Sequence, residues 1–223
     1  MKVNVVIDIE MCTVSSKSQK YPGKHEIIQI GAVMMNDLYE IVDKFSTYVT
    51  PRYGKINNYI LSLTGISERT IKGAPEIEEA LEAMIQWIGE REAIFFSWSP
   101  TDYYQIRKEV RWKCREEVKE EPGWAWLLNQ DNWIDYQEAF GKRLGSTRNL
   151  ALMEALDLAE VEIEGRLHDG LDDAYNTACL ISKLETDKAY QTLLERFRTR
   201  EEERAPLTVN LGSLMQGLIL EPA

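Results

Sequence analysis

The sequence VNVVIDIE at residues 3–10 is short, apolar and β-branched, which is typical of a buried strand. Side chains two residues apart on a strand point to the same face, so Asp8 and Glu10 would present two carboxylates together at its end. Such a pair is unfavourable unless a cation neutralises it, and hard divalent ions such as Mg²⁺ or Mn²⁺ can do so. The alternative is an ordinary solvated strand end.

The elements outside this strand alternate between strands and helices. Apolar runs bounded by turn residues predict strands, and apolar positions at helical spacing predict helices. The predicted strands are residues 26–35 (EIIQIGAVMM), 44–49 (KFSTYV), 93–98 and a short one at 133–134. The predicted helices are residues 75–89, 100–114, 136–144, 147–156, 172–184 and 188–198. This order of elements is typical of an α/β protein.

The composition indicates one globular domain. Hydrophobic residues make up 44% of the 223-residue chain, which is enough to supply a core. We predict a single domain over residues 1–199, followed by a C-terminal tail at 200–223. The tail combines a charged run with the apolar, glycine-broken stretch VNLGSLMQGLIL. Two interpretations of it stay open, a docking tail or a disordered end.

The termini and the cysteines bear on location. The N-terminus lacks the long apolar stretch and the cleavage site of a secretory signal, and no segment approaches the roughly twenty apolar residues of a membrane span. Cys12, Cys114 and Cys179 have no CxxC spacing and fit reduced thiols, so we expect a cytoplasmic protein. With only His25 and His168 present, a zinc site has little to draw on.

Two further motifs carry acids at places where catalytic groups occur. Asp102 follows a predicted strand in FFSWSPTD, and the alternative is that it caps or opens its helix. In RLHDGLDDAYNTACL, His168 precedes Asp173 by five residues across a glycine-containing loop and into a helix. A base and a carboxylate could therefore converge on one cleft. Asp169, Asp172 and Asp173 could equally be acids of a first helical turn.

The order of these motifs resembles the DEDDh exonucleases of the ribonuclease H-like fold. EIIQIGAV, SLTGIS at 62–67, FFSWSPTD and NWIDYQEAF also look like segments of that family, so the likeness covers roughly residues 3–184. GRLHDGLDDAYNTA at 165–178 is most similar to the Eri-type and KapD-like exoribonuclease branch. The resemblance implies a mixed sheet flanked by helices, and a metal-dependent 3′–5′ exonuclease that releases nucleoside 5′-monophosphates, with RNA as its expected substrate.

The resemblance also implies roles for the acids and the histidine. Asp8 would bridge two divalent cations, Mg²⁺ or Mn²⁺, with Glu10 and Asp173 completing the first. Asp102 would act near the second cation through water. His168 would take the proton from the attacking water, a role that suits an imidazole.

Recognition of the 3′ end is assigned by the same resemblance to two segments. The first is the backbone after Glu10, at Met11 and Cys12, and the second is the loop Leu63-Thr64-Gly65-Ile66. Leu63 or Ile66 could wedge against the terminal base, and an ordinary core contact is the alternative. The likeness places Trp98 near the metal site, although an aromatic residue beside a strand is more often part of a core.

Binding of a polyanion requires local positive charge in a chain with 37 acidic and 26 basic residues and a net charge of −11. Two groups are candidates for a basic rim: the helical stripe Arg107, Arg111 and Arg115, and the loop residues Lys17, Lys20 and Lys24. The alternative for both is a solvated charged surface.

Two other functions remain as alternatives to the exoribonuclease. The preference for RNA depends on branch likeness and on the glycine at Gly170, so a DNA exonuclease of proofreading or repair is the enzymatic alternative. The other is a regulatory or adaptor module that keeps the fold and binds a protein partner through the apolar tail. All five expected catalytic residues are present, which disfavours an inactive enzyme.

Overall fold

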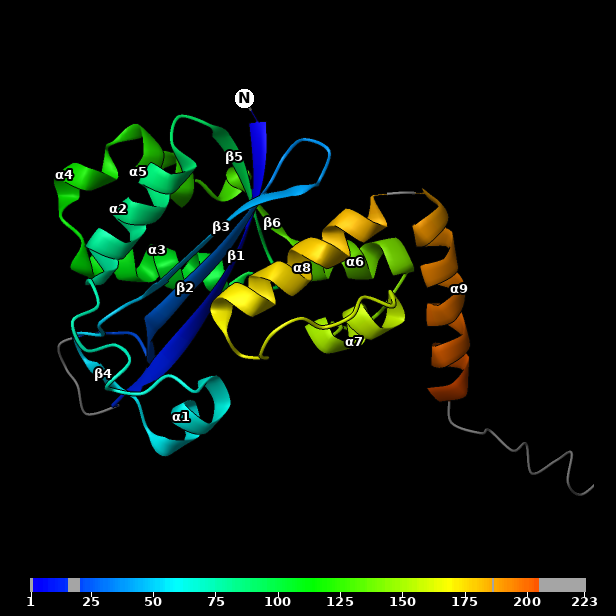
Figure 1. Cartoon of the computed structure of the whole chain (residues 1–223), viewed down its shortest axis with the longest axis horizontal. Helices are drawn as coiled ribbons and strands as arrows, with labels where there is room; N and C mark the ends of the chain where they lie inside the picture. Colours follow the sequence, from blue (N-terminus) through cyan, green and yellow to red (C-terminus); the bar gives the residue numbers. More distant parts are fainter. Residues whose placement is uncertain (1, 16–20, 186, 205–223) are drawn as a thin grey trace, which may run out of the picture.

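The computed structural model describes residues 2–15, 21–185 and 187–204, which form a mixed sheet with helices on both faces (Figure 1). The strands are β1 (Lys2–Val14), β2 (His25–Met35), β3 (Ile41–Tyr48), β4 (Gly54–Lys55), β5 (Glu92–Ser97) and β6 (Trp133–Asp135). Their order is β3-β2-β1-β5-β6, and β4 pairs with the end of β1. Strand β1 is antiparallel to β2 and parallel to β5, so the predicted mixed α/β architecture is confirmed.

The helices divide between the two faces of the sheet. They are α1 (Asn58–Thr64), α2 (Ile77–Ile88), α3 (Thr101–Lys113), α4 (Glu116–Lys119), α5 (Pro122–Leu128), the 3₁₀ turn η1 (Gln130–Asn132), α6 (Tyr136–Leu144), α7 (Leu152–Leu158), α8 (Gly170–Leu184) and α9 (Asp187–Arg204). Figure 1 shows α2 to α5 on one side of the sheet and α6 to α9 on the other. This arrangement leaves β1 covered on both faces.

The two faces of β1 supply two different cores. Val5 and Ile7 pack with apolar residues of α2 and α3, whereas Val6 packs with apolar residues of α6 and α8. Burial on both faces explains why this strand is apolar without interruption until its first acid. It also places even-numbered residues of β1 on the α8 side, which is where Asp8 and Glu10 fall.

Most predicted elements are confirmed, with changed ends. The strands predicted at 26–35, 44–49, 93–98 and 133–134 are β2, β3, β5 and β6, and the helices predicted at 75–89, 100–114, 136–144, 172–184 and 188–198 are α2, α3, α6, α8 and α9. The first strand does not end at Glu10, because pairing of Thr13 with Lys55 in β4 extends it to Val14.

Four helices depart from the sequence prediction. Helices α1, α4 and α5 were not predicted, since four to seven residues show too little of a helical period. The helix predicted at 147–156 begins later, at Leu152. The Ser146 hydroxyl bonds both the N–H and the carbonyl of Arg148 (3.2 and 2.8 Å), and such local bonding competes with helix formation.

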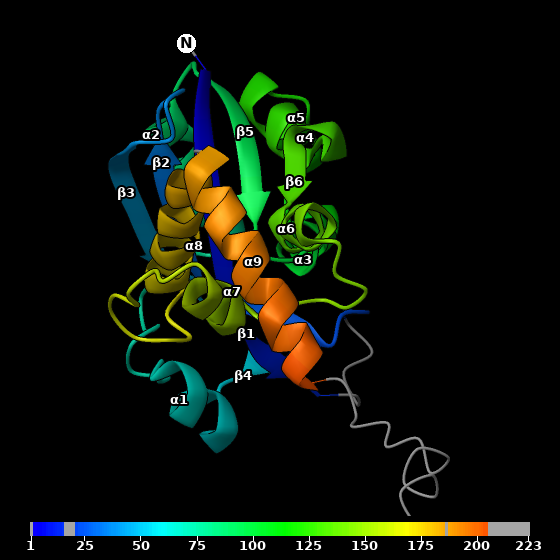
Figure 2. The same cartoon turned by 90° about the vertical axis from the view of Figure 1, so that its right-hand side faces the viewer.

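Helix α9 runs across the predicted domain boundary. It runs to Arg204, so the boundary set between residues 199 and 200 falls inside a helix. Arg200 pairs with Asp157 at 2.7 Å, and Glu201 pairs with Arg148 at 3.0 Å, which ties the end of α9 to the α7 region (Figure 2). The rest of the predicted tail, residues 205–223 with their apolar stretch, lies outside the described residues. None of the helices in the described part of the chain has the length and apolar character of a membrane span.

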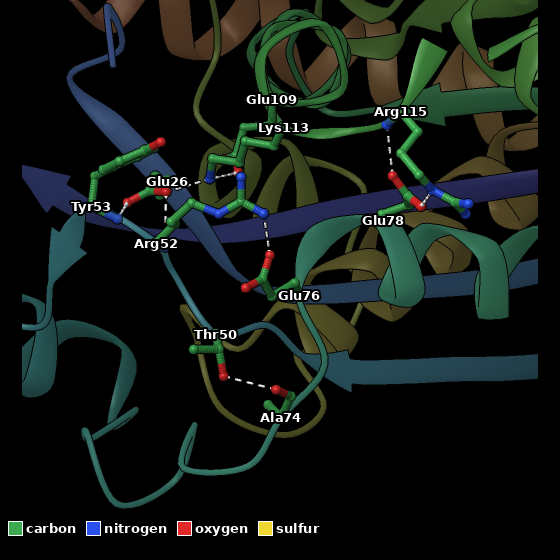
Figure 3. Close-up of polar contacts among 10 residues, drawn as sticks. All are labelled: Glu26, Thr50, Arg52, Tyr53, Ala74, Glu76, Glu78, Glu109, Lys113 and Arg115. Carbon is green, nitrogen blue, oxygen red and sulfur yellow. Dashed lines mark hydrogen bonds and ion pairs between the residues drawn. The ribbon is translucent and has the colours of Figure 1, made fainter. Parts of the chain in front are cut away.

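A buried ionic cluster joins β2 to α3 on the side of the sheet opposite α8 (Figure 3). The Lys113 ammonium pairs with the carboxylates of Glu26 and Glu109, and all three side chains are at most 3% exposed. Glu26 also accepts backbone N–H groups of Arg52 and Tyr53 at 3.0 and 2.7 Å. One carboxylate therefore fixes both α3 and the chain that leads into β4 and α1.

Candidate metal centre

Strand β1 supplies the first two acids of the site. Asp8 lies opposite Gly31 of β2 and is half-buried, while Glu10 lies opposite Gln29 and is 9% exposed. The register with β2 shifts immediately after Glu10, because Met11 pairs with Ile27 and leaves Ile28 of β2 as an extra residue in the ladder. Both carboxylates therefore project from one strand on the face that α8 covers.

Two glycines bring α8 into contact with the strands. A Cβ added at Gly31 would lie 2.1 Å from the carbonyl carbon of Gly170, and one added at Gly170 would lie 3.0 Å from the carbonyl oxygen of Asp8. Only glycine permits so close an approach of backbone to backbone. Gly170 therefore has a packing role here, which is to seat the start of α8 against Asp8.

The same helix end is held by a side chain that the sequence analysis does not single out. Gln29 is 2% exposed; its amide oxygen accepts the N–H of Gly170 and its amide nitrogen donates to Asp169, each at 3.1 Å. Asp169 caps the helix by accepting the N–H of Leu171 at 3.0 Å. A polar residue inside the apolar run EIIQIGAV was the available signal for this anchor.

Asp173 and His168 reach the site from the start of α8. Asp173 is 9% exposed, and its Oδ2 accepts the backbone N–H of His168 at 2.9 Å. His168 adopts a left-handed backbone conformation (φ 61°), and its side chain is exposed. Donor atoms of Glu10, His168 and Asp173 lie within 4.8 Å of one another. Residues far apart in the sequence are thus brought together, as expected.

Asp102 enters from the opposite side of β1. It lies in the first turn of α3, is 7% exposed, and accepts the backbone N–H of Ile9 through Oδ1 at 3.1 Å. That bond places the start of α3 beside the strand residue between Asp8 and Glu10. Asp102 therefore does more than open its helix, because its carboxylate is shared with the strand.

Burial, and for Asp8 and Glu10 also the charges of neighbouring acids, raises the pKa values in this cluster. Burial and then the charges of Asp102, Asp173 and Glu10 raise the pKa of Asp8 well above its usual value. Burial and then Asp173 raise the pKa of Glu10 to about 8. Burial likewise raises the pKa of Asp102 to about 7, although its hydrogen bond from Ile9 opposes the shift. The cluster is therefore costly to ionise without a cation.

The donor set fits divalent cations. Carboxylate oxygens are the ligands that Mg²⁺ and Mn²⁺ prefer. The Oδ1 atom of Asp173 is buried and has no hydrogen-bond partner among the described residues, so it is available as a ligand. A cation would satisfy this oxygen and would offset the repulsion that raises the pKa of Asp8 and of Glu10.

The raised pKa values predict that the metal-free protein becomes less stable as pH rises. The pKa of a Glu side chain in an unfolded chain is about 4.3, whereas the pKa of Glu10 in the folded protein is about 8. Between those values the folded protein holds more protons, so its free energy of unfolding falls as pH increases. From about pH 5.5 to about pH 8 we expect a loss on the order of 3 kcal/mol in urea denaturation with EDTA.

The Glu10→Gln protein is the control for that titration. It should show a smaller loss over the same pH range, because one of the shifted carboxylates is absent. Saturating Mn²⁺ should also reduce the loss in the unsubstituted protein, since the cation binds the ionised form. An identical pH dependence in both proteins would contradict the assignment of the titration to Glu10.

Comparison with known proteins places this site in a family. The family model described as Exonuclease matches residues 5–181, which include all four acids and His168. The chain belongs to the exonuclease family. The predicted family resemblance is thereby confirmed, as is the ribonuclease H-like architecture.

Individual relatives of this exonuclease chain are named as ribonucleases. ERI1 exoribonuclease 2 of Xenopus laevis is 31% identical over 188 residues, covering 74% of this chain and 26% of the relative. The 3′-5′ exoribonuclease 1 of Mus musculus is 28% identical over 177 residues, covering 73% of this chain and 48% of the relative. The chain thus spans about a quarter to a half of the length of these two relatives.

A solved structure shares the fold. The nuclease domain of 3′hExo, a DEDDh family member bound to rAMP, superposes with a TM-score of 0.64 at 23% sequence identity. The alignment covers 84% of this chain and 94% of that domain. This likeness supports the order of sheet and helices described above for the exonuclease.

The segment at 63–66, which is expected to bind the 3′ end, contains buried side chains and one half-buried side chain. Leu63 and Thr64 are not in a loop, because they form the last turn of α1, and Gly65 caps it in a left-handed conformation (φ 68°). Ile66 is 2% exposed and packs with Cys12, so the side chain of Ile66 has the core contact that was the alternative to a wedge against the base. Leu63 is half-buried, so of the two side chains predicted to wedge against the base it is the more accessible one.

Trp98 belongs to the core of this exonuclease domain. It is 8% exposed, its indole N–H donates to the carbonyl of Leu150 at 3.2 Å, and its ring contacts those of Tyr136 and Phe140. The side chain therefore has the core position of the alternative, and its contact with substrate stays a prediction. Its backbone carbonyl accepts the N–H of Gln137 at 3.0 Å, which ties β5 to α6.

Arg166 is a second residue that the sequence analysis does not single out. Its guanidinium donates to the carbonyl of Leu63 at 3.3 Å and lies against Gly65, where an added Cβ would overlap it. Its charge lowers the pKa of Glu10, opposing the larger effect of burial. Arg166 therefore links the end of α1 to the segment that carries His168. Its place two residues before that histidine was the only signal in the sequence.

Proposed function

We propose that the chain is a 3′–5′ exoribonuclease that releases nucleoside 5′-monophosphates from single-stranded RNA. One observation carries the proposal: β1, α3 and the start of α8 bring four carboxylates and one exposed imidazole to a single place. The names of the relatives as exoribonucleases support RNA as the substrate. The membership of the chain in the exonuclease family supports hydrolysis from an end.

Asp8, Glu10, Asp102 and Asp173 would hold two divalent cations, Mg²⁺ or Mn²⁺. When bound, such ions polarise the scissile phosphate and stabilise the charge that develops on the leaving oxygen. The residues of the chain restrict water at the site and set the spacing of the ligands. Burial of Glu10 and Asp173 restricts water around the reacting group. The contact of Gly170 with Asp8 sets the separation between the carboxylates of Asp8 and Asp173, because Asp173 lies on the helix that begins at Gly170.

His168 would accept the proton of the attacking water. Its backbone N–H is held by Asp173, while its imidazole stays exposed and within 4.8 Å of the donor atoms of Glu10 and Asp173. This position allows a proton to move from a water at the acids to the imidazole and then to solvent. The left-handed backbone at His168 is maintained by the hydrogen bond that orients the residue.

The 3′-terminal nucleotide would lie between β1 and the end of α1. The pairing of β1 with β2 shifts register between Glu10 and Met11. Arg166 bonds the carbonyl of Leu63 at the end of α1, and its charge acts on Glu10, which supports the nearness of the two segments. Backbone groups at these positions can bind the terminal hydroxyls, and Leu63 can contact the base. Gly65 suits this place because it needs a left-handed conformation and no side chain.

Cleavage of end-labelled strands tests the proposed function. Single-stranded RNA and DNA, each labelled at the 5′ end, should yield ladders that shorten from the 3′ end with Mg²⁺ or Mn²⁺, and RNA should be degraded faster. His168→Ala should lower turnover by about 10² to 10⁴ without changing the melting temperature. The matched control is His25→Ala, which replaces the other exposed histidine and should retain full activity.

Each alternative has a distinct result in that assay. Faster degradation of DNA would favour the exonuclease of proofreading or repair. No degradation of either strand would favour the adaptor module, in which the fold serves protein binding. Equal losses in His168→Ala and His25→Ala would contradict the role of His168.

Arg166 gives a separate prediction about positioning. Arg166→Gln should lower kcat by about tenfold, because the segment that carries His168 loses its bond to the carbonyl of Leu63. Arg166→Lys should recover part of the loss, since a single donor can still reach that carbonyl. The pH–rate profile should change with kcat, whereas a purely structural role would alter only the melting temperature. The control is Arg91→Gln, which removes a helix-end hydrogen bond to Ile88.

A further inference from the structure

The exposed face of α3 has an unusual composition for so acidic a chain. Within Thr101–Lys113, which is described throughout, the acids Asp102 and Glu109 are both buried. The exposed residues are Thr101, Tyr104, Arg107, Lys108, Arg111 and Trp112. Cations and aromatic rings therefore form this face, although the chain has a net charge of −11.

Spacing gathers these residues on one side of the helix. Counted from Tyr104, the cations and Trp112 fall three, four, seven and eight residues later, which are neighbouring positions on a helix surface. Tyr104 is 48% exposed and Trp112 is 55% exposed, so both rings are open to solvent. The stripe from Tyr104 to Trp112 covers nine residues. Its ends are eight helical steps apart, or about 12 Å along the axis.

A surface hollow lies beside the two arginines. It has a volume of about 400 Å³ and is lined by Arg107, Val110, Arg111, Glu116, Lys119 and Leu128. Glu116 pairs with Lys119 at 2.7 Å, so the two arginines supply the remaining positive charge. The hollow thus combines cationic side chains with two apolar ones, Val110 and Leu128.

Arg115 does not belong to this stripe, contrary to the sequence prediction. Its side chain pairs with Glu78 at 2.6 Å, and its backbone N–H donates to the same carboxylate at 2.7 Å (Figure 3). Of the predicted lysine group, Lys24 is exposed, while Lys17 and Lys20 lie outside the described residues. The cationic face of α3 therefore ends at Trp112.

We infer that this face of α3 binds the single-stranded part of the nucleic acid that leads into the site, an inference that rests on the proposed function. Helix α3 begins at the site, because Asp102 bonds to Ile9, and its exposed face then runs away from it. Cations that follow a phosphate backbone, interleaved with rings on which bases stack, are the elements of sequence-independent single-strand binding. About 12 Å accommodates about three phosphates at the stacked rise of about 3.4 Å.

A comparison of substrate lengths tests the inference. The variants are the double substitution Arg107→Gln/Arg111→Gln and the single substitution Trp112→Ala. Each should raise KM for a twelve-nucleotide RNA by about tenfold and leave kcat unchanged, because stacking and phosphate contacts act on binding. Turnover of a trinucleotide, which is too short to follow the stripe, should be unchanged.

The salt dependence of affinity gives a second readout. In the Asp8→Asn background, the slope of log Kd against log salt concentration for the twelve-nucleotide RNA should decrease by about 1.4 in the double variant, which is about 0.7 for each lost phosphate contact. The matched control is Lys2→Gln/Lys142→Gln, an equal change of charge at exposed lysines of β1 and α6. It should leave the slope and KM unchanged.

Either of two results would overturn the inference. An unchanged KM in both α3 variants would leave the face to a partner such as an acidic protein, and equal effects in the control would show that net charge alone matters. Failure of the proposed function is distinguishable, because it would appear as absence of cleavage by the unsubstituted protein at either length. The salt slope would still measure binding to α3 in that case.

Discussion

Replacing Asp8 by Asn should abolish turnover and, at the same time, raise the melting temperature of the metal-free protein. Asp8 is the acid that experiences Asp102, Asp173 and Glu10 together, and their charges add to burial in raising its pKa. Loss of the carboxylate removes a proposed metal ligand, so we expect turnover to fall by at least about 10³-fold. The same change removes repulsion and should stabilise the protein by about 1–2 kcal/mol near pH 8.

Thermal unfolding in EDTA, followed beside RNA cleavage in Mn²⁺, measures both effects. For a chain of this size, the gain corresponds to about 2–8 °C. Asp37→Asn, at an exposed turn between β2 and β3, is the control and should change neither quantity. A decrease in melting temperature together with lost turnover would show that the variant is misfolded. Turnover within tenfold of the unsubstituted protein would refute the role of Asp8.

Replacing Lys113 by Met should cause the largest loss of stability. The substitution leaves Glu26 and Glu109 buried without their shared cation, and burial already raises the pKa of Glu109. Removing one partner of a buried ionic cluster typically costs about 3–5 kcal/mol, because the remaining charges are uncompensated. Urea denaturation at neutral pH measures this loss directly.

Two further proteins separate charge from packing at Lys113. Lys119→Met removes a lysine whose partner, Glu116, is 86% exposed, and it should change stability by less than about 1 kcal/mol. Adding Glu26→Gln and Glu109→Gln to Lys113→Met should recover part of the loss, since the buried charges are then absent. A triple variant no more stable than Lys113→Met would show that the loss comes from packing.

The sequence predicts features whose causes are local. The apolar run before Asp8 is a strand because both of its faces are covered, and its period of two places Asp8 and Glu10 on one face. The helical spacing over 77–88 is equally visible, because one face of α2 packs on the sheet. The acids of the site are therefore found by motif and by spacing.

Other features depend on contacts between distant segments and leave little trace in the sequence. The approach of Gly31 to Gly170, the bonds of Gln29 and the link from Arg166 to α1 each join residues at least a hundred positions apart. Burial of Ile66 and Trp98 likewise follows from neighbours supplied by other elements. Residue type alone does not distinguish such side chains from ones that contact a ligand.

The backbone contact between Gly31 and Gly170 sets the distance from Asp8 to Asp173, and it is possible only because neither glycine has a side chain. A single methyl group at either position would overlap the backbone of the other element and push α8 away from the sheet. A displacement on the order of 1 Å at a reacting centre can cost about 10²-fold in rate. The two glycines that determine the spacing of the acids therefore carry no functional group themselves. Their substitution would change the distance between the carboxylates, and so lower the rate, although every acid would still be present.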